Sequence, residues 1–186
     1  MRVFDNSLVQ FWGKKEDFGL LRARFPIPMH SQGYYFTIEV VHTNDDECVL
    51  DIGVTSKGLK SKSIGFGKMV EISRDGSGFR KFPYSFGYSS SGIIYGTSTP
   101  EKMSQKQTYS AGDVIGCYVD NIDAICCFTK NGILLNKLIH LTNADEPLFP
   151  TIAFSSNGTI INSCFSETKF EFDKQGINEL ESFNIK

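Results

Sequence analysis

The sequence predicts an all-β protein, an antiparallel β-sandwich of two sheets with little helix. Composition is the first reason, since 16 Phe and 7 Tyr stand against 1 Trp, and aromatic residues fit pleated sheets. Spacing is the second: short apolar runs follow one another closely, separated by clusters of Gly, Asn, Asp, Ser and Pro. The third is the pair Asn131 and Gly132, because both residues tolerate the positive φ angles of a tight type I′ hairpin turn.

Four strands are expected in the first third of the chain, at residues 8–12, 19–25, 34–42 and 48–55. Pro26 ends the second strand, because proline cannot donate a hydrogen bond to a central ladder. In the third strand alternate side chains point the same way, so Phe36, Ile38 and Val40 should share one face of the sheet.

The later strands are expected at residues 64–72, 84–88, 93–96, 113–120, 124–129, 133–138, 148–154 and 159–165. Asn157 and Gly158 are predicted to join the last two of these as a second hairpin. Helical spacing is found only at residues 174–185, where Ile177 and Leu180 lead the pattern. We therefore expect a single domain at residues 1–173, followed by a tail at 174–186 that holds this short helix.

Charge and hydropathy restrict the partners that we expect. The formal net charge is -2, which does not favour a broad surface for nucleic acid. No apolar run approaches the ~20 residues of a membrane span, and the first residues lack the long apolar core of a signal peptide. We expect a soluble monomer that binds neither nucleic acid nor membrane, in the cytoplasm or also in the nucleus. The alternative to a chain made without a signal peptide is a longer precursor from which a leader has been removed.

The five cysteines are expected to be structural. Their number is odd and no CxxC pair occurs, which favours buried free thiols in a reducing compartment over a zinc site. Cys126 and Cys127 should point to opposite faces of one strand. Asp113, four residues before Cys117, is interpreted as part of a turn that enters a buried strand, in which Gly116 admits a close neighbour.

No constellation of catalytic residues is recognised. His30, His42 and His140 are scattered without the spacing of metal ligands or of a catalytic triad. The glycines before Lys68 lack the spacing of a phosphate-binding loop, and no helix follows them. We expect no catalytic, cofactor-binding or metal-binding residue and no enzymatic activity.

Eight short motifs occur in an order that points to one family. They are RARFPIP (22–28), GYYFTIEV (33–40), DIGVT (51–55), YSFGYSSSG (84–92), GDVIGC (112–117), FTKNG (128–132), LFPTI (148–152) and KFEFD (169–173). Over residues 8–173 the chain resembles the SPRY domain of the B30.2 family, and within it the subtype of Ran-binding protein M. The resemblance implies a concanavalin-like sandwich.

The resemblance also implies where a partner binds, namely in a shallow pocket made by rigid loops at one end of the sandwich. Three loops match the binding segments of the family: residues 12–17, 88–95 and 154–158. The site residues they are expected to contribute are Trp12, Lys14, Tyr88, Ser89, Ser90, Ser91, Tyr95, Ser155, Ser156 and Asn157. For Trp12 two interpretations stay open, an exposed anchor for the partner or a cover for the sandwich edge.

The function expected from the resemblance is non-catalytic recognition of a peptide segment or loop of a protein partner. It implies a substrate-receptor role in a ubiquitin ligase as the cellular setting. The alternative is a carbohydrate-binding lectin built on a similar sandwich. Its candidates are Tyr88 and the acidic residues within 120–123.

Overall fold

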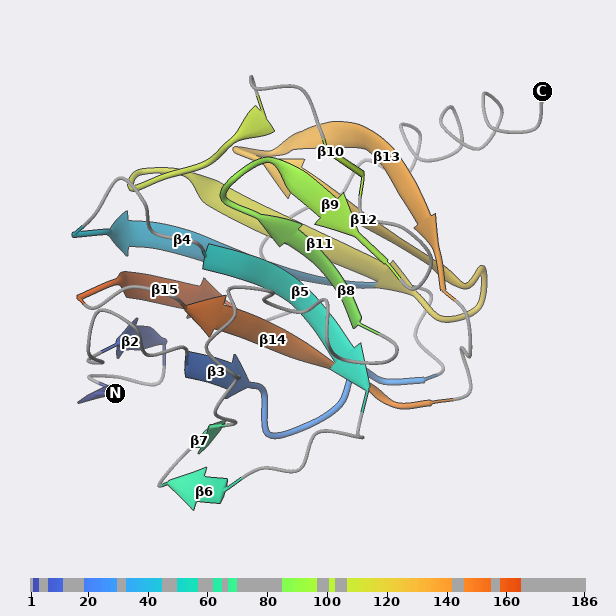
Figure 1. The fold of residues 1–186 in the computed structure, drawn as a ribbon. Coiled ribbons are helices and arrows are strands. Elements are labelled where there is room, and N and C mark those ends of the chain that lie inside the picture. Colours follow the sequence, from blue (N-terminus) through green and yellow to red (C-terminus); the bar gives the residue numbers. More distant parts are fainter. Residues whose placement is uncertain are drawn as a thin grey trace.

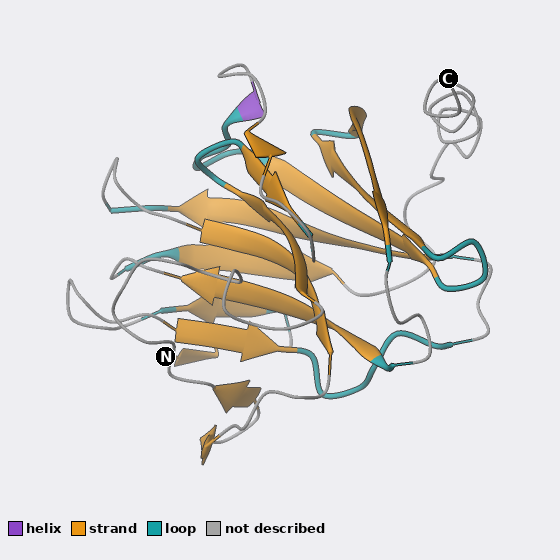
Figure 2. Cartoon of the chain, turned by 45° about the vertical axis from the view of Figure 1, so that its right-hand side comes forward, coloured by secondary structure: helices purple, strands orange, loops and turns teal. Residues whose placement is uncertain are grey.

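The structure, a computed structural model, is a sandwich of two antiparallel sheets (Figure 1). It describes residues 2–3, 7–11, 19–29, 33–44, 50–56, 62–64, 67–69, 85–96, 101–102, 107–141, 146–154 and 158–164. Strands make up most of this part of the chain (Figure 2). It contains no α-helix; the short helical piece drawn in purple is a 3₁₀ turn at Gln107. The predicted fold class is confirmed, whereas the helix predicted at 174–185 lies outside the described residues.

Sheet A contains seven strands. In spatial order they are β1 (Arg2–Val3), β2 (Leu8–Gln10), β15 (Ile160–Cys164), β4 (Tyr34–His42), β11 (Val114–Asp120), β12 (Ile125–Lys130) and β13 (Ile133–His140).

Sheet B contains eight strands. In spatial order they are β10 (Glu101–Lys102), β9 (Ile93–Tyr95), β8 (Ser85–Ser89), β5 (Leu50–Ser56), β14 (Leu148–Phe154), β3 (Gly19–Arg22), β7 (Gly67–Met69) and β6 (Lys62–Ile64).

The strands lie close to their predicted positions, with three differences. The short strands β1 and β10 were not expected. The stretch 64–72 was expected to hold one strand; the structure pairs β6 with β7 there, with Ile64 opposite Gly67. The hairpin predicted at Asn157 and Gly158 is wrong, because β14 belongs to sheet B and β15 to sheet A, so that this connection crosses the sandwich.

The hairpin predicted at Asn131 and Gly132 is confirmed. Their φ angles are 52° and 79°, as a type I′ turn requires, and Lys130 pairs with Ile133 across it. The Asn131 side chain also accepts a hydrogen bond from the Val114 N–H at 2.8 Å. The turn is therefore tied to β11 as well as to its own two strands.

The main core lies between the sheets, and a second cluster lies on the outer face of sheet A. β4, β11 and β12 supply most of the main core from sheet A, and β5, β8 and β14 supply it from sheet B. Phe36, Ile38 and Val40 all belong to it, as the alternation predicts. Cys126 lies in the main core and Cys127 in the second cluster, which confirms their opposite orientations.

The close neighbour predicted for Gly116 is Tyr35. An ideal Cβ at Gly116 would lie 2.5 Å from Cζ of the Tyr35 ring, so only glycine leaves room for that ring. The Tyr35 hydroxyl forms a hydrogen bond of 2.7 Å with Oγ1 of Thr129. Gly116 therefore lets one side chain of β4 cross β11 and reach β12.

Candidate functional site

The strands that flank the three predicted loops all meet at one end of the sandwich. Gly19, where the first loop ends, pairs with Phe154, where the third begins. Phe154 also pairs with Leu50 of β5, and the neighbouring Asp51 pairs with Ser89, where the second loop begins. We call this the loop end; it is where the arrow of β4 points in Figure 1.

Phe11 joins the first loop to the third. Its N–H donates to the Thr159 carbonyl at 2.9 Å, and the Gly158 N–H donates to the Phe11 carbonyl at 2.9 Å. Its ring stacks on that of Phe154, with centroids 5.5 Å apart and planes 7° apart. The loops at 12–17 and 154–158 therefore start from one rigid pair of aromatic residues.

The second loop is held by hydrogen bonds to the neighbouring strand. The Ser90 N–H donates to the Leu50 carbonyl at 2.8 Å, and the Leu50 N–H donates to Oγ of Ser90 at 3.0 Å. The hydroxyls of Ser89 and Ser91 are 2.9 Å apart. Both the backbone and the hydroxyls therefore hold the turn after β8 against β5.

Tyr109 stabilises the same turn through hydrogen bonds to three carbonyl groups. Its buried hydroxyl donates to the carbonyls of Leu50 and of Tyr88, the latter at 2.9 Å, and its N–H donates to the Ser90 carbonyl at 3.2 Å. No role was predicted for Tyr109 from the sequence. It is the only aromatic residue within the polar stretch 97–111. A single aromatic residue in a polar segment often anchors that segment to the core, and this signal could have identified Tyr109.

Asp113 lies at the loop end, next to β11 of sheet A, and holds the neighbouring turns together. Its carboxylate accepts hydrogen bonds from the Ser110 N–H at 2.9 Å and from the Asn131 side chain at 2.8 Å, and forms an ion pair with Lys130 at 3.1 Å. Burial raises its pKa, but these hydrogen bonds and the Lys130 charge more than offset burial, so that the net pKa is lowered.

The lowered pKa of Asp113 predicts a pH dependence of stability. The stabilisation is present above the ordinary aspartate pKa of about 4 and is lost as the pH falls through the lower pKa of the folded state. At pH 7 we expect Asp113→Asn to lower the free energy of unfolding by about 1–2 kcal/mol. Urea unfolding of both proteins from pH 8 to pH 2.5 should show this difference shrink in acid. A difference that stays constant to pH 2.5 would contradict the assignment.

The structure places the predicted residues of the second loop at different depths. Ser91 is exposed, Ser90 is half-buried and Ser89 is buried. Tyr95 lies on β9 opposite Gly87, and its side chain lies outside the described part of the structure. The residues predicted from the other two loops, Trp12, Lys14, Ser155, Ser156 and Asn157, also lie outside it.

Tyr88 is a core residue, so the prediction that it contacts a partner directly does not fit the structure. Its side chain is 0% exposed, and its ring lies 4.8 Å from that of Tyr109 and 5.9 Å from that of Phe128. Burial, followed by the nearby charge of Asp113, raises its pKa to about 12. Tyr88 shares its strand face with Phe86, and this alternation is what directs it inward.

The acidic residues that a lectin would use are engaged in the fold. The Asp120 carboxylate accepts hydrogen bonds from the Tyr118 hydroxyl at 2.9 Å and from the N–H groups of Ile122 and Asp123. Within the described residues, no group of three His, Cys, Asp or Glu side chains could hold a metal ion. Neither finding favours the lectin alternative.

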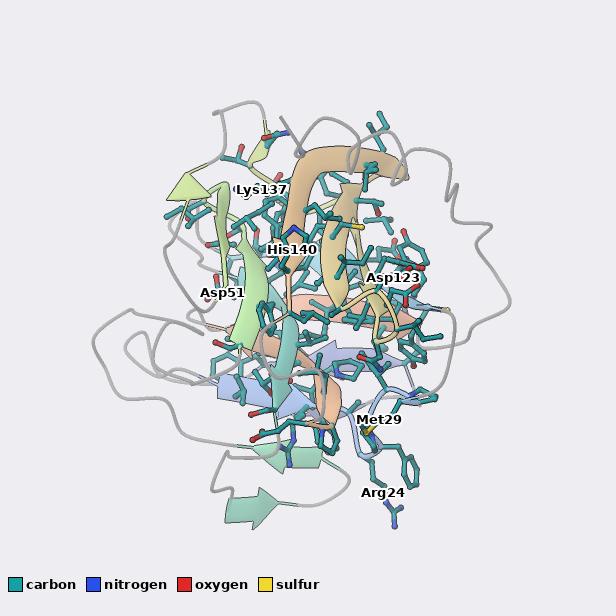
Figure 3. The ribbon with its side chains drawn as sticks, turned by 90° about the vertical axis from the view of Figure 1, so that its right-hand side faces the viewer. Arg24, Met29, Asp51, Asp123, Lys137 and His140 are labelled. Carbon is teal, nitrogen blue, oxygen red and sulfur yellow. The ribbon has the colours of Figure 1, made fainter. Side chains whose placement is uncertain are left out.

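The opposite end of the sandwich carries exposed apolar side chains. Figure 3 looks onto this end, with Arg24 and Met29 on the loop after β3 and Asp123 on the turn after β11. Phe25 is 71% exposed and Ile122 is 61% exposed. These two positions serve below as controls, because they lie away from the loop end.

No helix in the described part of the chain is long and apolar enough to cross a membrane. Cys117, Cys126 and Cys127 are buried free thiols, Cys164 is half-buried, and Cys48 lies outside the described residues.

A sandwich in which the strands that flank three loops meet at one end is a common scaffold for binding loops. Comparison with known proteins identifies the family: a model of the SPRY domain matches residues 33–168. The chain belongs to the SPRY domain family, whose members are generally protein-interaction modules.

Relatives and solved structures agree with this assignment. The chain is 29% identical over 159 residues to Ran-binding protein 10 of Danio rerio and to Ran-binding protein 9 of Homo sapiens. These matches cover 85% of this chain but 23% and 19% of the relatives, so the chain spans less than a quarter of their length.

Two solved structures share the fold. A human SPRY domain superposes with a TM-score of 0.64 at 20% identity, covering 88% of this chain and 94% of that one. The SPRY domain of human HERC1 gives a TM-score of 0.62 at 18% identity, with coverages of 90% and 94%.

Proposed function

We propose that this chain is a non-catalytic recognition module that binds a peptide segment or an exposed loop of a protein partner at the loop end. The finer role that we propose, from the family resemblance, is that of a substrate receptor or adaptor of a ubiquitin ligase. We further propose that the module works as a monomer in the cytoplasm or the nucleus, without contact to nucleic acid or membrane.

The observation that carries the proposal is the shared framework under the three loops. Phe11 and Phe154 link the first loop to the third, and the pairing of Phe154 with Leu50 links the third loop to the turn at Ser90. The loops are separated in sequence by tens of residues, yet their bases form one connected set. A partner that touches all three therefore meets a single surface.

Rigidity of this framework supports binding in a second way. Association costs free energy when loops must be ordered, and each immobilised side chain adds about 0.5–1.5 kcal/mol to that cost. The turn at Ser89, Ser90 and Ser91 is already held by Leu50 and Tyr109. A partner would therefore meet a surface that is ordered before binding.

The chemistry of the loops suggests the kind of partner. Hydroxyl groups at Ser90 and Ser91 suit the backbone of an extended peptide, whereas Trp12 and Tyr95 are of the residue types that most often anchor interfaces. We therefore propose that an apolar side chain of the partner sits near the aromatic residues while its backbone bonds to the serines.

The test has two stages, identification of a partner and placement of its site. Affinity purification from the native cell with mass spectrometry supplies partners, and the strongest is purified for calorimetry. Trp12→Ala combined with Tyr95→Ala, and separately Ser91→Arg, are the loop-end variants. Ile122→Arg and Phe25→Ala are matched exposed changes at the opposite end.

The double variant is expected to weaken binding by about 100-fold or more, since two anchor residues are removed. Ser91→Arg should weaken it by obstruction. Both should melt within a few degrees of the unmodified chain, and the two opposite-end variants should bind normally. A folded double variant that still captures the partner would remove the site from the loop end. Binding lost only in the opposite-end variants would move it there.

A further inference from the structure

The second cluster forms a row across four strands on the outer face of sheet A. Tyr35 on β4 pairs with Tyr118 on β11, Tyr118 with Cys127 on β12, and Cys127 with Leu138 on β13. Ile125 and Leu134 lie beside this row. We call these six residues the outer cluster. Their side chains face away from the main core, on the side of an antiparallel sheet that usually meets water.

Four of the six residues are nevertheless buried, and Tyr35 and Leu134 are partly buried. The exposed fractions are 4% for Tyr118, 0% for Cys127 and 7% for Leu138. Gly33 accounts for part of this, because an ideal Cβ there would lie 2.6 Å from the Tyr118 ring. No described strand lies over the row, since every described strand belongs to sheet A or sheet B. A large tyrosine on an open sheet face does not reach 4% exposure without a cover.

We propose that the cover is the C-terminal segment of the same chain, residues 165–186. The chain leaves sheet A at Cys164, which pairs with Thr37, two residues along β4 from Tyr35. The segment therefore begins beside the row. This inference is independent of the proposed function, because the outer face of sheet A is not part of the loop end.

The length of the C-terminal segment is sufficient for it to cross the outer cluster. Strands in a sheet lie about 4.8 Å apart, so the distance from β15 to β13 over four spacings is about 19 Å. An extended chain crosses that distance in about six residues. The 12 residues from 174 to 185 would span about 18 Å as a helix, which is close to the distance from β15 to β13.

Side-chain chemistry supports it as well. Ile177, Leu180 and Phe183 fall on one side of the predicted helix, at a spacing of three residues. Asn178 and Ser182 fall on the other side. An apolar stripe of this kind has to be covered for so short a helix to persist. The outer cluster offers an apolar surface at the place where the chain reaches it.

Cys127 reports whether the outer face is covered, and Cys126 is its internal control. The two thiols are neighbours on β12 but face opposite sides of sheet A. Burial, followed by the proximity of Cys126, raises the pKa of Cys127 and keeps its thiol protonated and unreactive. Uncovering the face should therefore expose Cys127 while Cys126 stays enclosed between the sheets.

The experiment uses the full chain with N-ethylmaleimide and peptide mass spectrometry at each cysteine. Ile177→Asp with Leu180→Asp places two charges on the apolar side; Asn178→Asp with Ser182→Asp places two charges on the polar side. The first variant should label at Cys127 about tenfold faster or more, through local opening. The second should label like the unmodified chain, and Cys126 should stay slow in both.

A Cys127 that stays unreactive in a folded Ile177→Asp, Leu180→Asp variant overturns the proposal. Protection that grows with protein concentration would assign the face to a second copy and would also overturn it. If the variant fails to fold, the unmodified chain decides. Nuclear Overhauser contacts between the Leu180 methyl groups and the Tyr118 ring are expected in it, and their absence rejects the docking.

Discussion

Replacing Phe11 with alanine is expected to lower the free energy of unfolding by about 3–5 kcal/mol, the range seen for buried phenylalanines. The ring is 2% exposed and stacks on Phe154 at 5.5 Å. Gly19 lies directly against it, because an ideal Cβ at that position would lie 2.8 Å from Cδ2 of the Phe11 ring and still closer to Cε2. Alanine would leave a cavity at the junction of β2, β3 and β14, where the backbone is already paired and cannot collapse to fill it.

The change should also weaken partner binding beyond its effect on stability. Alanine keeps the backbone hydrogen bonds of Phe11 to Gly158 and Thr159 but removes the ring that stacks on Phe154, where the third loop begins. The bases of the first and third loops therefore lose their shared side-chain contact. Guanidinium unfolding measures the stability. Calorimetry at a temperature where the variant is still folded measures the binding. Phe25→Ala, at a position that is 71% exposed, should change neither. A Phe11→Ala protein that loses less than about 1 kcal/mol would show that the ring is not an anchor.

The sequence was sufficient for most of the strands, because strand formation here follows local patterns. From Phe36 to Val40 in β4 every second residue is apolar, and this pattern correctly directs Phe36, Ile38 and Val40 into the core. Asn131 and Gly132 specify a turn whose geometry depends on two backbone angles. Features of this kind are written within a few residues and need no information about the rest of the chain.

Local residues do not determine which sheet a strand joins, and for this reason the predicted second hairpin was wrong. Asn157 and Gly158 have the same residue types as Asn131 and Gly132, and Gly158 does have a positive φ of 83°. Yet β14 pairs with β3 and β5, whereas β15 pairs with β2 and β4. A turn motif indicates that the chain bends, but the strands with which the two flanking segments pair depend on residues far away in the sequence.

The candidate site was predicted in outline but not in detail. The resemblance placed three loops at one end, and the register of the strands around them agrees. It did not distinguish depth: Tyr88 alternates with Phe86 into the core, while Ser91 is exposed. Nor did it find Tyr109, whose role depends on carbonyl groups of Leu50 and Tyr88 that are distant in sequence.

Gly53 is a further position whose role only the assembled sheet reveals. It lies on β5 between Gly87 of β8 and Thr151 of β14. An ideal Cβ there would lie 2.7 Å from the Gly87 Cα and 2.9 Å from the Phe86 carbonyl carbon. These are backbone atoms within a paired ladder, so they cannot turn aside as a flexible side chain would. The sequence motif DIGVT contains this glycine but does not show that Gly87 lies opposite it.

Gly53→Ala is therefore expected to destabilise the protein by about 3 kcal/mol or more, at the upper end of the cost of overpacking. β5 and β8 would have to separate, and the turn at Ser90, which is hydrogen-bonded to Leu50, would move with them. Gly132→Ala is the matched control, because an ideal Cβ there meets nothing within 4 Å and only its φ of 79° is strained. That change should cost about 1 kcal/mol. Equal urea midpoints for the two variants would mean that β5 and β8 are not held as closely as their register implies.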